Sequence, residues 1–210
     1  MGAHSGSLTY KVFFVQGELP ENWEGLFVER INLNAFEELD PEQEEDESIG
    51  WVDIQDPLNT RLELSDIRQD QYLNLGLRRD RFALPKDLLD AHIKRAEETY
   101  KQKNDKDRLD KYEQEDIETM VTRDLREDSL PKMRVTDVSW HLPSGRVRFW
   151  SHANKMCDLF QGLFDETFGL DVVPSSPYTN AVELGLTAER IEHLQHAEAT
   201  DFVSGTPIGE

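Results

Sequence analysis

The segment that most restricts the fold begins at Pro85, where apolar residues start to recur at spacings of three and four. This spacing predicts an amphipathic helix, and Pro85 suits its first turn because no amide donor is needed there. The apolar stripe thins into a charged run around Asn104 and resumes from Leu109 to Leu125, which predicts a helical hairpin or two consecutive helices. We expect so long and charged a segment to protrude as an arm, since charged side chains are rarely buried.

Segments typical of β-strands lie on both sides of this predicted arm. Residues 8–15 are apolar and aromatic, and residues 50–54 and 72–77 are shorter candidates. The clearest β-hairpin spans residues 133–151, with its turn at Pro143-Ser144-Gly145. Period-two alternation places one set of its side chains inward and the other outward. The predicted inward set is Val138, Trp140, Leu142, Val147 and Phe149, and the outward set is His141, Arg146, Arg148 and Trp150.

The remaining segments complete an α+β pattern. Residues 20–36 and 153–168 have helical spacing, and residues 170–173 form a further strand candidate. We expect residues 174–186 to be mostly loop or strand, and Thr187 to cap a final helix that runs through His193. This order predicts an α+β domain with a mixed or antiparallel sheet, packed helices and a protruding charged helical arm.

Four parts follow from this pattern along the chain. The first three together would build the α+β domain and its arm, and the fourth would be a loose tail. Their predicted limits are residues 1–84 for the strand-helix-strand part, 85–131 for the arm, 132–200 for the hairpin-helix-strand part and 201–210 for the tail.

Composition favours an ordered protein that stays inside the cell. The chain has 210 residues, of which 37% are hydrophobic and 31% charged, as is ordinary for a folded domain. Its one cysteine, Cys157, permits no intrachain disulfide, and the sequence has neither an apolar run of membrane-spanning length nor an export signal. We expect a cytoplasmic protein with no membrane partner.

Catalytic and metal-binding patterns are absent from the sequence. His193 and His196 are the closest histidine pair, and they lack a nearby third ligand. Cys157 lies among apolar residues of a predicted helix, which favours a buried small side chain over a nucleophile. Phosphate-loop, dinucleotide-binding and nucleophile-elbow motifs do not occur. We therefore predict no enzymatic activity, no metal and no cofactor.

Basic residues gather in three places despite a formal net charge of -20. A protein this acidic can bind a polyanion only through a local basic surface. Residues 37–47, in contrast, hold eight acidic side chains and no basic one. The alternative for the helical bases is pairing with neighbouring acids such as Glu97 and Glu98. The candidate phosphate contacts are Arg78, Arg79 and Arg81 after a strand, Lys94, Lys101 and Arg108 at seven-residue intervals on one helical stripe, and Arg146 and Arg148 on the hairpin.

From Gly50 to about Leu186 the chain resembles the recombination-associated RdgC family in the order and spacing of several features. These are Gly50-Trp51-Val52, a strand leading into Arg81-Phe82-Ala83-Leu84-Pro85, a charged helical arm, the Val138-Ser139-Trp140 hairpin with Ser144-Gly145 at its turn, and the later Val172-Val173-Pro174 and Val182-Glu183-Leu184. The resemblance implies a non-enzymatic, ring-forming homodimer that encloses double-stranded DNA non-specifically. It also implies association with the nucleoid and a role in restraining recombination by occluding DNA.

Two departures from the family pattern are visible. Family members are longer, so the resemblance implies that this chain lacks the C-terminal part that helps to complete each half-ring. The contact between arms in the family uses a Pro-Arg-Ala-Phe-like segment, and the corresponding stretch here is Thr122-Arg123-Asp124-Leu125. Arg123 and Leu125 are therefore the expected contacts at the arm tip.

Two functional hypotheses remain open at this stage. The first is a shortened RdgC-like protein that binds double-stranded DNA through the bases of the arm and hairpin. The second is an acidic protein-interaction module with the same fold that no longer binds DNA. In that case residues 37–47 would repel phosphates or engage a basic protein partner.

Overall fold

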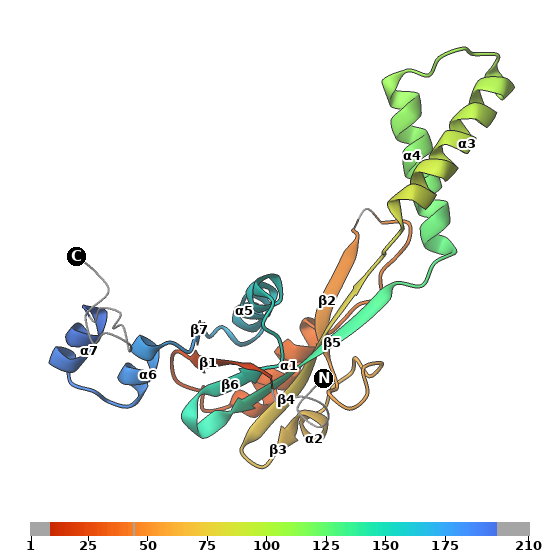
Figure 1. Ribbon diagram of the computed structural model, residues 1–210. Helices are drawn as coiled ribbons and strands as arrows, with labels where there is room; N and C mark the ends of the chain where they lie inside the picture. Colours follow the sequence, from red (N-terminus) through yellow and green to blue (C-terminus); the bar gives the residue numbers. More distant parts are fainter. Residues whose placement is uncertain (1–8, 44, 197–210) are drawn as a thin grey trace.

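The computed structural model describes residues 9–43 and 45–196, and within them seven strands form one antiparallel sheet. The strand order is β2-β4-β5-β6-β1-β7, with the short β3 paired to β4 outside this path (Figure 1). The strands are β1 (Lys11–Val15), β2 (Glu47–Val52), β3 (Arg68–Gln69), β4 (Tyr72–Arg81), β5 (Lys132–His141), β6 (Arg146–Phe149) and β7 (Val172–Pro174). The predicted α+β class is confirmed.

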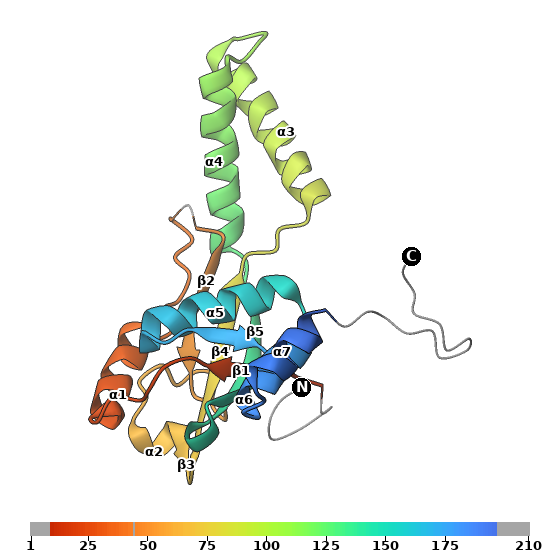
Figure 2. The same ribbon diagram turned by 90° about the vertical axis from the view of Figure 1, so that its left-hand side faces the viewer.

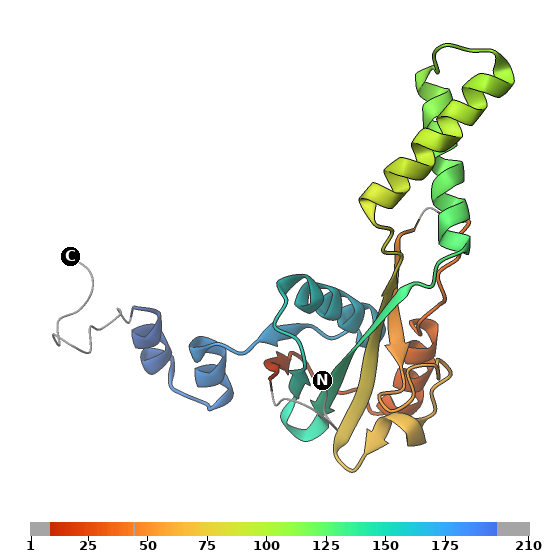
Figure 3. The same ribbon diagram turned by 45° about the vertical axis from the view of Figure 1, so that its right-hand side comes forward.

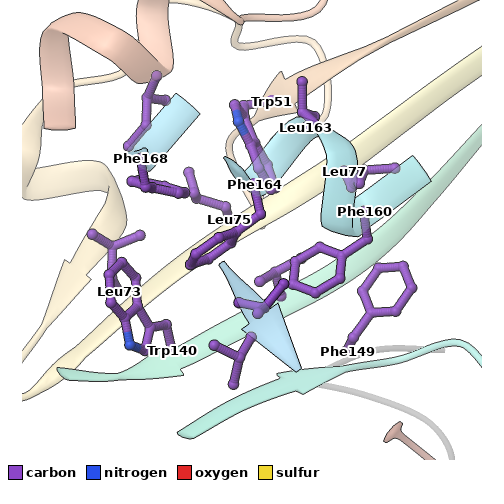
Figure 4. Close-up of a cluster of buried hydrophobic side chains, with 14 of the residues drawn as sticks. Trp51, Leu73, Leu75, Leu77, Trp140, Phe149, Phe160, Leu163, Phe164 and Phe168 are labelled. Atoms are coloured by element: carbon purple, nitrogen blue, oxygen red, sulfur yellow. The ribbon is translucent and has the colours of Figure 1, made fainter. Parts of the chain in front are cut away.

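Helices α1 (Trp23–Leu33) and α5 (Asn154–Phe168) cover one face of the sheet and enclose the core. Leu73, Leu75 and Leu77 of β4 point toward this face at alternate positions and are buried (Figure 4). The side chains on one face of β4 thus pack against the apolar faces of α1 and α5. The short helix α2 (Leu64–Ile67) lies before β3.

Aromatic rings fill the centre of this core. The ring of Trp140 lies 5.2 Å from that of Phe164 and 5.7 Å from that of Phe27, between centroids. The indole N–H of the fully buried Trp51 donates a 2.8 Å hydrogen bond to the hydroxyl of Thr167. This bond satisfies a polar group that would otherwise be costly to bury.

Helices α3 (Lys86–Asn104) and α4 (Lys111–Glu127) form an antiparallel hairpin that projects far from the sheet (Figures 1 and 2). We call this hairpin the arm, its junction with β4 and β5 the root, and the connecting residues 105–110 the tip. Asp105 closes α3 with a left-handed backbone, φ 51°, and Asp110 caps α4 by accepting a 2.9 Å hydrogen bond from the amide of Glu113. The predicted protruding arm is confirmed.

Contacts near the tip tie the two helices together. The hydroxyl of Tyr100 donates a 3.1 Å hydrogen bond to Glu113, and Lys106 donates another to the same carboxylate. The bond from Lys106 holds the pKa of Glu113 below its ordinary value. Glu113 therefore remains ionised at neutral pH and links both helices to the turn.

The β-hairpin and the helix after it agree with the sequence prediction. Val138 pairs with Phe149 and Trp140 with Val147, which places all four side chains on the core face. Gly145 closes the turn with φ 63°, a conformation that glycine adopts without strain. The buried Cys157 of α5 agrees with its predicted place in the core.

The C-terminal region differs from its prediction. Residues 174–186 contain a helix, α6 (Pro177–Glu183), where we expected mostly loop or strand. Proline at the first helical turn and a capping box between Ser176 and Thr179 start this short helix. It is followed by α7 (Ala188–Gln195), and Figure 3 shows both helices standing away from the sheet. Thr187 occupies the N-cap position of α7 without a side-chain cap bond.

Predicted segments at the chain ends fall partly outside the described residues. Leu8, the first residue of the predicted first strand, lies outside them, and so does the predicted tail at 201–210.

Candidate nucleic-acid interface

The longest strand pair of the sheet carries a group of basic side chains where it leaves the core and approaches the arm. In the register of β4 and β5, Arg79 pairs with Arg134 and Arg81 with Lys132. Both pairs continue the face that carries Leu77, because side chains two residues apart share a face. The four basic side chains line a cavity of about 250 Å³. We call Arg79, Arg81, Lys132 and Arg134 the root cluster.

The carboxylate of Glu47 lies at the edge of the root cluster, where it contacts Arg79. Nε of Arg79 donates a 2.9 Å hydrogen bond to Oε2 of Glu47, and Nζ of Lys155 lies 3.2 Å from Oε1. The bond from Arg79 holds the pKa of Glu47 below its ordinary value, against burial, which acts in the opposite direction. Glu47 is therefore ionised at neutral pH and neutralises part of the charge of Arg79 and Lys155.

The other three members of the root cluster keep their full charge available. Arg81, Lys132 and Arg134 are exposed, and they form no ion pair with any residue that the structure describes. Four cations around one cavity, only one of which is ion-paired with a carboxylate of the described residues, produce a positive potential that attracts phosphate oxygens. Arginine additionally offers a planar fork of donors that matches a phosphate group.

A second basic surface lies on the opposite face of the sheet, at the hairpin. Arg146 pairs with His141 in the register, and Arg148 pairs with Ser139. The guanidinium of Arg148 lies 5.8 Å from the ring centroid of Tyr10 and 5.9 Å from that of Tyr72. These rings hold Arg148 through cation–π contacts and leave it half-buried. The predicted placement of Arg146 and Arg148 on one face is confirmed by the register.

Arg78, in contrast, is part of the fold rather than of an exposed surface. Its Nη2 lies 2.5 Å from Oδ2 of Asp80, and its Nη1 donates a 3.1 Å bond to the carbonyl of Pro57. Its guanidinium also lies 3.9 Å from the ring centroid of Phe36, and the residue is only 8% exposed. The basic segment that we expected after a strand lies within β4, so alternation turns Arg78 away from Arg79 and Arg81. The prediction of a DNA contact at Arg78 is corrected accordingly.

The predicted stripe of arm bases is interrupted. Lys94 and Lys101 lie on α3, but this helix ends at Asn104, and Arg108 lies in the tip. Because Asp105 reverses the chain direction, seven-residue spacing no longer places Arg108 in line with the two lysines. The alternative, pairing of the lysines with Glu97 and Glu98, is not found among the described residues either. The ion pairs within the arm are Lys106–Glu113, Lys111–Glu115, Arg123–Asp124 and Arg123–Glu127.

Arg123 and Leu125 lie at the opposite end of the arm from their predicted position. Both are in the last turns of α4, next to the root, whereas the tip consists of residues 105–110. Arg123 is half-exposed and lies 3.8 Å from Glu127, and Leu125 is half-buried between the two helices. The family-based assignment is corrected because the chain already turns at Asp105.

Sequence reasoning missed Lys132 and Arg134. Their spacing repeats that of Arg79 and Arg81, and this alternation is the signal that could have identified them. The prediction ended the earlier strand at Leu77, which concealed the pairing of the two basic segments.

Comparison with known proteins leaves the family open. No protein-family model matches this sequence, and no curated protein matches it either. In the described part of the chain, no helix is long and apolar enough to cross a membrane, and no group of three or more His, Cys, Asp or Glu residues could hold a metal ion.

Proposed function

We propose that this protein binds double-stranded DNA without sequence preference and acts by occlusion rather than by catalysis, as its resemblance to the RdgC family implies. The observation that carries the proposal is the root cluster, in which four cations from two paired strands face one cavity in a chain of net charge -20. In this proposal the protein acts in the cytoplasm on the nucleoid and modulates recombination by covering DNA.

Phosphate contacts explain why such binding would ignore base sequence. Lysine and arginine neutralise phosphates and release condensed counterions, and neither effect depends on the bases. Arg146 and Arg148 supply a second contact on the opposite sheet face. The acidic remainder of the molecule repels DNA, so binding is confined to the surfaces where bases gather.

A salt titration tests the proposal. We expect fluorescence polarisation of unrelated short duplexes to give affinities that fall with salt, with a slope of log affinity against log salt of about -3 to -4 for four phosphate contacts. The Arg81→Glu/Arg134→Glu variant should lose this binding, because it converts two exposed cations of the cavity into anions. An Arg146→Glu/Arg148→Glu variant measures how much the hairpin contributes to DNA affinity.

A matched control separates local contacts from net charge. The Lys111→Glu/Arg190→Glu variant changes the net charge by the same amount at two exposed positions on α4 and α7. It should bind DNA more weakly than the unmodified protein but far more strongly than the root-cluster variant. Equal losses in both variants, or no binding of any duplex at low salt, would contradict the proposal.

Glu47→Gln is expected to increase DNA affinity. The substitution removes the Glu47 carboxylate from the edge of the root cluster and releases Arg79 and Lys155 from their ion pairs. One unit charge near the surface contributes about 1 kcal/mol, so affinity at low salt should rise about fivefold. The same polarisation titration measures this change. An unchanged or lower affinity would show that phosphates do not approach the root cluster.

A specific observation also favours the second candidate, an acidic protein-interaction module. Nη1 of Arg126, at the root, donates a 2.8 Å hydrogen bond to the carbonyl of Gln43 and pairs with Asp46 through Nη2. Gln43 and Asp46 of the acidic segment are thereby fastened to the root end of α4. This arrangement would display carboxylates to a basic protein partner. Retention of a basic protein, together with no DNA binding at any salt concentration, would favour this function.

A further inference from the structure

Strands β4 and β5 place like charges directly opposite one another at the root. In their register Arg79 pairs with Arg134, and Arg81 pairs with Lys132. Like charges at opposite positions destabilise a sheet, whereas opposite charges stabilise it. Glu47 neutralises part of the charge of Arg79, and the other three members of the root cluster form no ion pair with a described residue. The strand pair therefore carries an electrostatic cost that an anion in the cavity would remove.

The four basic residues of the root cluster form a compact rectangle rather than a row. The Cβ atoms of opposite residues in an antiparallel pair lie about 5 Å apart, and two residues along a strand span about 7 Å. All four side chains line one cavity of about 250 Å³. This volume is below the range of about 300 to 1,000 Å³ that is usual for drug-sized ligands. The cavity therefore suits a small anion that carries several charges close together.

Helix α5 begins beside the same cluster. Sδ of its Met156 lies 3.8 Å from Nη1 of Arg79, and Nζ of its Lys155 lies 3.2 Å from Oε1 of Glu47. The N-cap position of α5 is Ala153, which provides no side-chain acceptor for the amides of the first turn. The N-terminal end of a helix carries a partial positive charge. This end of α5 therefore adds to the attraction that the root cluster exerts on an anion.

We propose that the root cluster binds a free diphosphate group, either inorganic pyrophosphate or the diphosphate of a nucleotide. Two directly linked phosphates concentrate their charge within the rectangle, and each cross-strand pair of cations can bind one of them. Duplex DNA, in contrast, distributes single charges along its axis. A diphosphate would compete with DNA phosphates for the root cluster, but its binding does not require that the protein bind DNA.

Thermal unfolding of the full chain at constant ionic strength tests this proposal without DNA. We expect pyrophosphate to raise the melting temperature by about 5 to 10 °C at a concentration about a hundredfold above its dissociation constant, which the same titration measures. Sulfate should produce a much smaller shift, because it offers one charged group instead of two linked ones. A shift with adenosine diphosphate as large as that with pyrophosphate would identify a nucleotide as the source, and a weaker one would identify free pyrophosphate.

The Arg134→Thr variant should change two properties in opposite directions. It should raise the melting temperature of the phosphate-free protein by about 2 °C, because it removes one pair of opposed like charges and threonine suits a strand. It should also raise the dissociation constant of pyrophosphate about tenfold or more, because one charged hydrogen-bond donor is lost. A residue with only a structural role would not combine a stabilising substitution with a loss of anion binding.

Lys111→Gln is the matched control, since it removes one positive charge from an exposed position on α4. Its response to pyrophosphate should equal that of the unmodified protein. Equal shifts with pyrophosphate and sulfate, a pyrophosphate response that survives Arg134→Thr, or an equal loss in Lys111→Gln would overturn the proposal. None of these results decides whether the protein binds DNA, because no duplex is present in the experiment.

Discussion

Replacing Gly50 with alanine is expected to lower the free energy of unfolding by about 3 kcal/mol, the upper end for overpacking a buried site. A Cβ atom at this position would lie 2.4 Å from the backbone N and Cα of Phe36. Backbone atoms cannot rotate away as a side chain can. The amide of Phe36 donates a 3.0 Å hydrogen bond to the carbonyl of Trp51, so this close approach is part of the sheet edge.

Gly162 provides the matched control for this substitution. It lies on the exposed side of α5, where a Cβ atom would meet nothing within 4 Å. Gly162→Ala should therefore stabilise the protein by about 1 kcal/mol, the difference in helix propensity between the two residues. Urea denaturation followed by tryptophan fluorescence measures both changes. Equal midpoints for the two variants would contradict the close packing at Gly50.

Asp80→Asn is expected to destabilise the protein by about 3 to 5 kcal/mol, the usual cost of leaving a buried charge without its partner. Asp80 is 2% exposed and accepts two hydrogen bonds from the guanidinium of Arg78, at 3.1 Å and 2.5 Å. The variant keeps the shape of the side chain but removes the charge that balances Arg78. Urea denaturation again provides the measurement.

A double variant distinguishes loss of a partner from loss of packing. Arg78→Met/Asp80→Leu removes both charges together, so it should cost less than Asp80→Asn alone. The same double variant should bind duplex DNA as tightly as the unmodified protein, because Arg78 is held between Phe36, Pro57 and Asp80 rather than facing a phosphate. A large loss of DNA affinity in this folded variant would show that Arg78 is part of the DNA interface.

Local patterns in the sequence were sufficient for the elements whose signal lies within a few residues. Spacings of three and four predicted the two-helix arm, and alternation predicted the β-hairpin with Arg146 and Arg148 on one face. Those periodicities reflect the geometry of a single helix or of one tight hairpin. The α+β class followed from the order of these elements.

Tertiary structure alone decided which basic residues meet. Arg79 and Arg134 are far apart in the sequence, and only the register of β4 with β5 brings them to one cavity. The same register buries Arg78 against Asp80, although it adjoins Arg79 in the chain. The left-handed Asp105 set the position of the tip and left Arg123 and Leu125 at the root. Local periodicity determines the face of an element on which a side chain lies, but pairing between distant segments determines what that face meets.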